Sequence, residues 1–149
     1  MQALYRGETI QFRIPGDPRY VSMVRRAMDC VARSLGFPED AAEDIALSVA
    51  EALANAVEHG SPEHKANAVV VVCRVDEDKL TIDVRDEGPG FELREPEKWY
   101  ECMEEHGRGL RLIYNLMDAV NVCHTRTGAR IRMVKHKRST RKARPVHSQ

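Results

Sequence analysis

Long apolar runs are missing from this chain of 149 residues. No stretch approaches the roughly 20 consecutive apolar residues that a membrane-spanning helix needs. The first residues, Met-Gln-Ala-Leu-Tyr-Arg, also lack the apolar core of a secretory signal. We therefore expect a protein that is not held in a membrane and that stays in the cytoplasm.

Paired cysteines are missing as well. The four cysteines form no C-x-x-C pair, which argues against a zinc site or a thioredoxin-like redox motif. Cys30, Cys73 and Cys123 lie within apolar patterns, and we expect buried free thiols at these positions.

Acidic residues are absent from the last part of the chain, where six Lys and Arg residues occur between Lys135 and Gln149. Because the whole chain has a net charge of zero, residues 1–134 carry −6. A basic tail can indicate nucleic-acid contact, but a solvated, disordered tail is the simpler interpretation, and direct nucleic-acid binding is not expected. We expect one folded domain over residues 1–134 and a basic tail over residues 135–149.

Hydrophobic periodicity predicts helices that alternate with pairs of strands. The expected order is a strand at 10–14, helices at 20–35 and 38–59, strands at 68–75 and 79–85, a helix from 110, and strands near 120–122 and 131–133. Residues 91–106 are polar and irregular, as in a long loop. This order predicts an α+β fold with two layers, in which helices pack on one face of a mixed, mostly antiparallel sheet.

The second expected helix carries a row of polar side chains. Glu51, Asn55 and His59 follow one another at intervals of four residues, so they lie along one helix face beside a separate apolar face. Amide and carboxylate oxygens suit a hard cation such as Mg²⁺, and a carboxylate can also accept a proton. Such a row is also typical of a solvated helix face.

Asp86 follows the strand at 79–85 and has the same parity as Leu80, Ile82 and Val84. If the alternation continues, its carboxylate points to the apolar side, where burial is costly without a hydrogen-bonding partner such as a ligand amino group. Alternatively, the strand ends at Arg85 and Asp86 begins a turn.

A glycine cluster, His106-Gly107-Arg108-Gly109-Leu110, leads into the third expected helix. Glycines let a backbone approach a ligand closely, and the N-terminus of a helix attracts anions. A simple loop before a helix would look the same.

Together these segments resemble the three ATP-binding boxes of the GHKL (Bergerat-fold) ATPase superfamily, and most closely those of the anti-sigma factor serine kinases. The matching residues are Glu51-Ala-x-x-Asn55-Ala-x-x-His59-Gly60, Asp86-Glu-Gly88-Pro-Gly90-Phe91 and Gly107-Arg108-Gly109-Leu110. The resemblance extends from about residue 12 to about residue 135.

The resemblance implies a role for each matching residue. Glu51 would be the general base, and Asn55 would bind Mg²⁺ through its side-chain oxygen. Asp86 would accept a hydrogen bond from the adenine of ATP. Gly88 and Gly90 would shape the adenine pocket. The backbone of Gly107, Arg108, Gly109 and Leu110 would contact the phosphates, and His59 at the end of the helix is a further implied contact. Residues 91–106 would form a lid over ATP, and the role of His59 is the least defined.

The resemblance also implies partners: a sigma factor, a STAS-type anti-sigma factor antagonist as the phosphorylation target, and a second copy of the chain in a homodimer. Two features depart from the family pattern. Gly128-Ala129 stands where a Gly-Thr pair is common, and the basic tail is not expected.

Two alternatives to an anti-sigma factor kinase remain open from the sequence. One is a nucleotide-binding switch with little or no phosphotransfer, although Glu51 beside Asn55 favours an enzyme. The other is a detached histidine-kinase catalytic domain, which is disfavoured because the sequence shows no two-helix segment with a phosphoacceptor histidine before the first strand.

Overall fold

The computed structural model describes residues 7–59, 68–87, 108–125 and 128–137. Within these ranges the elements are β1 (Glu8–Pro15), the 3-10 helix η2 (Pro18–Tyr20), α1 (Val21–Ser34), α2 (Glu39–His59), β2 (Ala68–Val75), β3 (Lys79–Glu87), α3 (Arg108–Leu116), β4 (Ala119–Thr125) and β5 (Gly128–His136).

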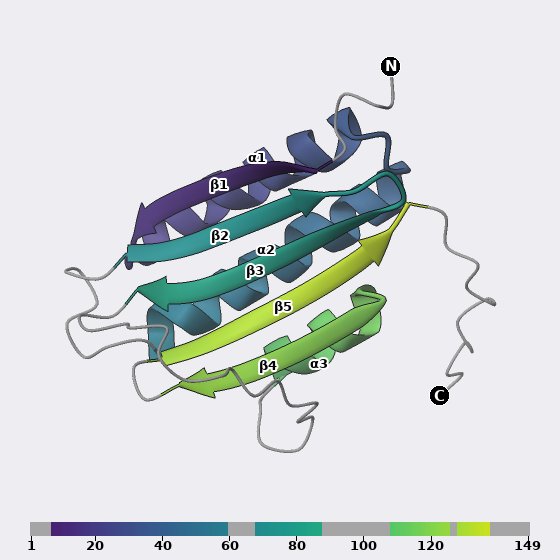
Figure 1. Ribbon diagram of the computed structural model, residues 1–149. Helices are drawn as coiled ribbons and strands as arrows, with labels where there is room; N and C mark the ends of the chain where they lie inside the picture. Colours follow the sequence, from purple (N-terminus) through teal and green to yellow (C-terminus); the bar gives the residue numbers. More distant parts are fainter. Residues whose placement is uncertain (1–6, 60–67, 88–107, 126–127, 138–149) are drawn as a thin grey trace.

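The five strands form one sheet in the order β1-β2-β3-β5-β4, and each neighbouring pair is antiparallel. Figure 1 shows the three α-helices together behind this sheet, on one of its faces. The predicted α+β fold with two layers is thus confirmed. Because β5 lies between β3 and β4, the chain crosses to the far edge of the sheet before it returns, and α3 packs beneath that edge.

Apolar spacing places α1 and α2 against the sheet. In α1 the buried residues Val24, Met28 and Ala32 recur every four positions. The helix is followed by Gly36, whose φ of 92° reverses the chain at little steric cost. Glu39 and Asp40 occupy the first turn of α2, where negative charge stabilises the helix dipole.

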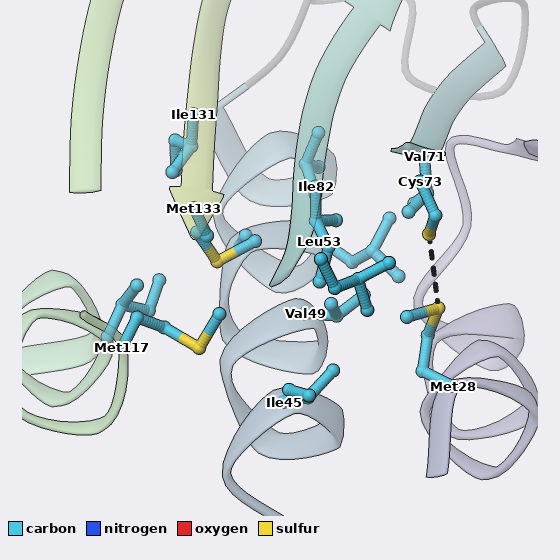
Figure 2. Close-up of a cluster of buried hydrophobic side chains, with 14 of the residues drawn as sticks. Met28, Ile45, Val49, Leu53, Val71, Cys73, Ile82, Met117, Ile131 and Met133 are labelled. Atoms are coloured by element: carbon cyan, nitrogen blue, oxygen red, sulfur yellow. Dashed lines mark hydrogen bonds between the residues drawn. The ribbon is translucent and has the colours of Figure 1, made fainter. Parts of the chain in front are cut away.

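The core fills the space between the helices and the sheet. Figure 2 shows Ile45, Val49 and Leu53 of α2 in the middle of this cluster. Met28 and Cys73 lie on one side, and the Cys73 thiol donates a hydrogen bond to the sulfur of Met28 over 3.6 Å. Burial raises the pKa of Cys73 to about 12, and the nearby charge of Asp83 adds to this shift.

The structure corrects three sequence expectations. Cys30 is exposed, because it lies on the side of α1 opposite Met28. The strand expected at 79–85 continues to Glu87. The expected domain boundary at residue 134 falls inside β5, so Lys135 and His136 belong to the sheet and not to a tail. Residues 138–149 lie outside the described ranges.

No helix within the described ranges is both long enough and apolar enough to cross a membrane.

Candidate nucleotide and phosphate site

The polar row of α2 lies at the boundary between the core and the surface. Glu51 and Asn55 are partly buried, whereas the neighbouring Ala52 and Leu53 are fully buried. α2 therefore presents a carboxylate and an amide beside a rigid apolar face. His59 is the last residue of α2, and its side chain lies outside the described part of the structure.

Gly109, in the first turn of α3, meets this polar row. A methyl group built on its Cα would lie 2.8 Å from Oε2 of Glu51. The same group would lie 3.6 Å and 3.8 Å from Nδ2 and Oδ1 of Asn55. The fold thus brings the first and third sequence motifs together, and only glycine lets the α3 backbone approach the carboxylate without moving it.

The apolar face of α3 explains why its first turn is held at this place. Leu110 and Ile113 are buried in the core, with 3% and 0% of their surface exposed. They fix the helix against α2 while its N-terminal turn remains beside Glu51. The first N–H groups of a helix have no partner within the helix and favour anions. The geometry of this turn suits a phosphate group next to a carboxylate and an amide.

Asp86 lies on the face of the sheet that carries the helices. It pairs in register with Val69 of β2, and only 4% of its surface is exposed. The alternation of Leu80, Ile82 and Val84 therefore continues through Asp86, and the turn interpretation of this residue is wrong. A carboxylate here can accept hydrogen bonds from a ligand that enters between the sheet and α2.

Several predicted site residues fall outside the described ranges. They are Gly88, Gly90 and Gly107, together with the predicted lid at 91–106. Arg108 is the first residue of α3, but its side chain lies outside the described part of the structure. The side chain of Leu110 is buried in the core.

A cavity of about 880 Å³ lies on the side of α2 that faces η2 and the start of α1. Its described lining consists of Gly16, Asp17, Pro18, Val21, Ala54, Val57 and Glu58. Glu58 follows Glu51 by seven residues, so the two carboxylates share one stripe of the helix. Neither Glu51 nor Asn55 is among its described lining residues, however, and the cavity lies on the α1 side of α2.

Sequence reasoning missed two clusters of paired charges. On the sheet face away from the helices, Asp83 is 2% exposed and accepts two hydrogen bonds from Arg132, of 2.7 Å and 3.0 Å. Arg130 adds a contact of 3.4 Å to the same carboxylate.

On the opposite face Lys135 contacts Asp44 of α2 at 3.2 Å. The residues of each pair are distant in sequence, 49 positions for Asp83 with Arg132 and 91 for Asp44 with Lys135, so no local pattern reveals them.

A model of the histidine kinase-like ATPase domain matches residues 14–135. Serine-protein kinase RsbW of Bacillus subtilis is 33% identical over 136 aligned positions, which cover 85% of this chain and 84% of the relative. The protein of the same name from Oceanobacillus iheyensis is 32% identical and covers 85% of each chain.

Solved structures agree with the fold. The RsbU and RsbW domains of a Mycobacterium tuberculosis protein superpose with a TM-score of 0.67 at 18% identity, covering 90% of this chain and 34% of that one. The histidine kinase domain of a blue-light activated kinase from Erythrobacter litoralis gives 0.54 at 20% identity, covering 83% and 62%.

The family match spans nearly the whole described domain and includes the α2 row, Asp86 and the start of α3. Membership implies an ATP-binding site, and the close approach of Gly109 to Glu51 is a feature that fits it. The chain belongs to the histidine kinase-like ATPase domain family and, within it, to the RsbW-type serine-protein kinases.

Proposed function

We propose that this chain transfers the γ-phosphate of ATP to a serine of a STAS-type anti-sigma factor antagonist, and that it sequesters a sigma factor. The observation that carries the proposal is the convergence of Glu51, Asn55 and the Gly109 backbone. A protein that only binds nucleotide has no need of a carboxylate at this place, whereas a kinase needs a base beside the transferred phosphate.

Glu51 is proposed as the general base. Its Oε2 lies beside the first turn of α3, where the terminal phosphate would be held by backbone N–H groups. A serine hydroxyl that approaches the phosphate from the side of Glu51 would give its proton to this carboxylate as the new oxygen–phosphorus bond forms and the bond from the γ-phosphorus to the leaving ADP breaks.

Asn55 is proposed to hold Mg²⁺ through its side-chain oxygen. An amide oxygen is a suitable ligand for this cation, which takes few protein ligands at phosphate sites. The bound ion would supply neutralisation of the phosphate charge. Asn55 lies one helical turn from Glu51, so the ion and the base would flank the same phosphate.

Asp86 is proposed to accept a hydrogen bond from the adenine amino group. Its burial on the helix-facing side of β3 places the carboxylate in the layer between the sheet and α2. Residues 91–106 are proposed to close over ATP as a lid.

We further propose that the chain acts in the cytoplasm as a homodimer, as the resemblance to anti-sigma factor kinases implies.

The proposal is tested by incubating the purified chain with Mg²⁺, labelled ATP and the STAS-type and sigma-factor proteins of its own organism. We expect label on serine of one STAS-type protein and a stable complex with one sigma factor. If ATP binds but no serine is labelled on any of these proteins, the chain is a nucleotide-dependent binding switch. Label on histidine would instead favour a histidine kinase.

A further inference from the structure

Lys135 is a buried cation that the proposed chemistry does not use. It lies on β5 opposite Leu80 of β3, on the face that carries the helices, and 5% of its surface is exposed. A buried ammonium group is costly unless it is paired. Its Nζ donates to Oδ2 of Asp44 in α2 at 3.2 Å and to the main-chain carbonyl of Leu116, the last residue of α3.

The end of α3 has two further bonds to the same strand. The N–H of Asp118 donates to the carbonyl of Val134 over 2.9 Å. The N–H of His136 in turn donates to the Asp118 carboxylate over 2.7 Å. Three consecutive residues of β5 therefore hold the C-terminal end of α3, and Lys135 occupies the position where a cation stabilises a helix terminus.

The two contacts of α3 with α2 have matching spacing. Asp44 and Glu51 are seven residues apart in α2, and Gly109 and Leu116 are seven residues apart in α3. Asp44 meets the end of α3 through Lys135, while Glu51 meets its beginning. The helices therefore run antiparallel, with two contact points separated by two turns, or about 10 Å.

Apolar packing between these points holds α3 against α2, and the Lys135 contacts add a directional constraint on its position. Ser48 lies on α2 between the two contacts, and Ile113 lies midway along α3; both are fully buried. Hydrophobic contact is non-directional, whereas the Lys135 ion pair and its carbonyl contact fix one position of α3 along α2.

We infer that Lys135 is a positioning residue that sets where the first turn of α3 lies relative to Glu51 and Asn55. A shift of α3 along its axis at the Leu116 end moves the N–H groups near Gly109 by the same distance, because a helix of nine residues is a rigid rod. The contacts at the Leu116 end of α3 therefore set the position of the phosphate site at its other end, about two helical turns away. The last step of this inference rests on the proposed function.

The test compares two substitutions on one strand. Lys135→Met removes the cation that contacts α3, and Arg132→Met removes a cation three residues away whose partner, Asp83, lies on the other face of the sheet. Amide hydrogen exchange of α3, affinity for Mg²⁺-ATP by calorimetry, and KM and kcat are measured for both variants, together with urea unfolding.

We expect Lys135→Met to speed exchange in α3 and to weaken ATP binding by about 3- to 30-fold, the range of coupling through positioning residues. Arg132→Met should change neither the hydrogen exchange of α3 nor the affinity for ATP by more than its loss of stability explains. Lys135→Arg should restore part of the affinity. If Lys135→Met does not fold, Asp44→Asn keeps the cation and its carbonyl contact and should show the same effects in milder form.

Equal loss of ATP affinity in Lys135→Met and Arg132→Met, after correction for stability, would overturn the inference, as would unchanged exchange in α3. The exchange measurement needs no nucleotide. Failure of the unmutated chain to bind ATP would thus refute the proposed function while leaving the anchoring of α3 separately tested.

Discussion

The two flanks of α2 are built differently. On one flank α2 packs against α1 and the β1–β2 side of the sheet through apolar side chains, among which Met28 is fully buried. On the other flank it meets α3, and polar groups lie at both ends of that contact: Glu51 and Asn55 at Gly109, and Asp44 at Lys135. Figure 2 shows α2 between Met28 on one side and Met117 on the other.

This difference separates stability from chemistry. Around Met28 and Cys73 the flank toward α1 is sealed, and burial there raises the pKa of the Cys73 thiol. The flank toward α3 leaves the backbone of Gly109 next to a carboxylate and an amide. A helix fixed on its apolar side can therefore present a polar row without distorting the core.

The largest expected effect on stability comes from the sealed flank. Met28→Ala should lower the free energy of unfolding by about 2–5 kcal/mol, because it opens a cavity next to Cys73. Urea unfolding measures this loss. ATP affinity of the remaining folded protein should stay near that of the unmutated chain. A large loss of affinity at full folding would show that the two flanks are not independent.

A change on the flank toward α3 should lower phosphotransfer and leave stability nearly unchanged. Gly109→Ala should leave the free energy of unfolding within about 1 kcal/mol, because alanine is favourable in a helix and only the Glu51 side chain must move. The displaced carboxylate should lower phosphotransfer by about 10- to 100-fold, since misplacement by 1 Å can cost that much.

Phosphotransfer rate and urea unfolding, measured on the same preparation, separate these effects of Gly109→Ala. The matched control is Ala41→Gly, which makes the reverse change at a partly buried position in the first turn of α2. It should lower stability and leave transfer by the folded fraction unchanged. Unchanged transfer in Gly109→Ala would mean that the close approach of α3 to Glu51 has no part in the reaction.

The smallest effect is the pH response of the sealed flank. The folded-state pKa of Cys73 is raised to about 12 from an ordinary value of 9.0, so its contribution to stability is complete below pH 9 and declines as the pH rises from there toward 12. Between pH 8 and pH 10 the unmutated chain should lose about 1 kcal/mol more stability than Cys73→Val.

Urea unfolding at the two pH values checks this difference. Thiol labelling of the native protein at pH 8 provides a second readout, in which exposed Cys30 should react and Cys73 should not. Rapid labelling of Cys73 would show that this flank opens to solvent.

The sequence pattern predicts the helices, the strands and the motifs, because all of these depend on local spacing. The helix faces of α1 and α2 and the parity of Asp86 follow from periods of 3.6 and 2. The encounter of Glu51 with Gly109 could be inferred only through the family resemblance, since these residues are far apart along the chain.

Contacts between distant elements could not be read from the sequence. The cationic neighbours of Lys135 in the sequence indicate a basic tail, yet the partners of this residue are in α2 and α3. Asp83 occupies a strand position with outward parity but is buried because two arginines of β5 cover it. Cys30 shows the converse error, since an apolar neighbourhood in a helix does not fix which face a residue occupies.

The central claim is that Glu51 performs the chemistry while Asn55 and the α3 backbone hold the nucleotide. It is tested most directly by measuring Mg²⁺-ATP affinity and the rate of transfer to the antagonist serine for Glu51→Gln and Asn55→Ala, with Glu43→Gln at an exposed position of α2 as the control.

We expect Glu51→Gln to bind ATP normally and to transfer phosphate about 10²- to 10⁴-fold more slowly, the usual effect of losing a general base. Asn55→Ala should lose binding and transfer together, and Glu43→Gln should behave like the unmutated chain. Near-normal transfer by Glu51→Gln would contradict the account.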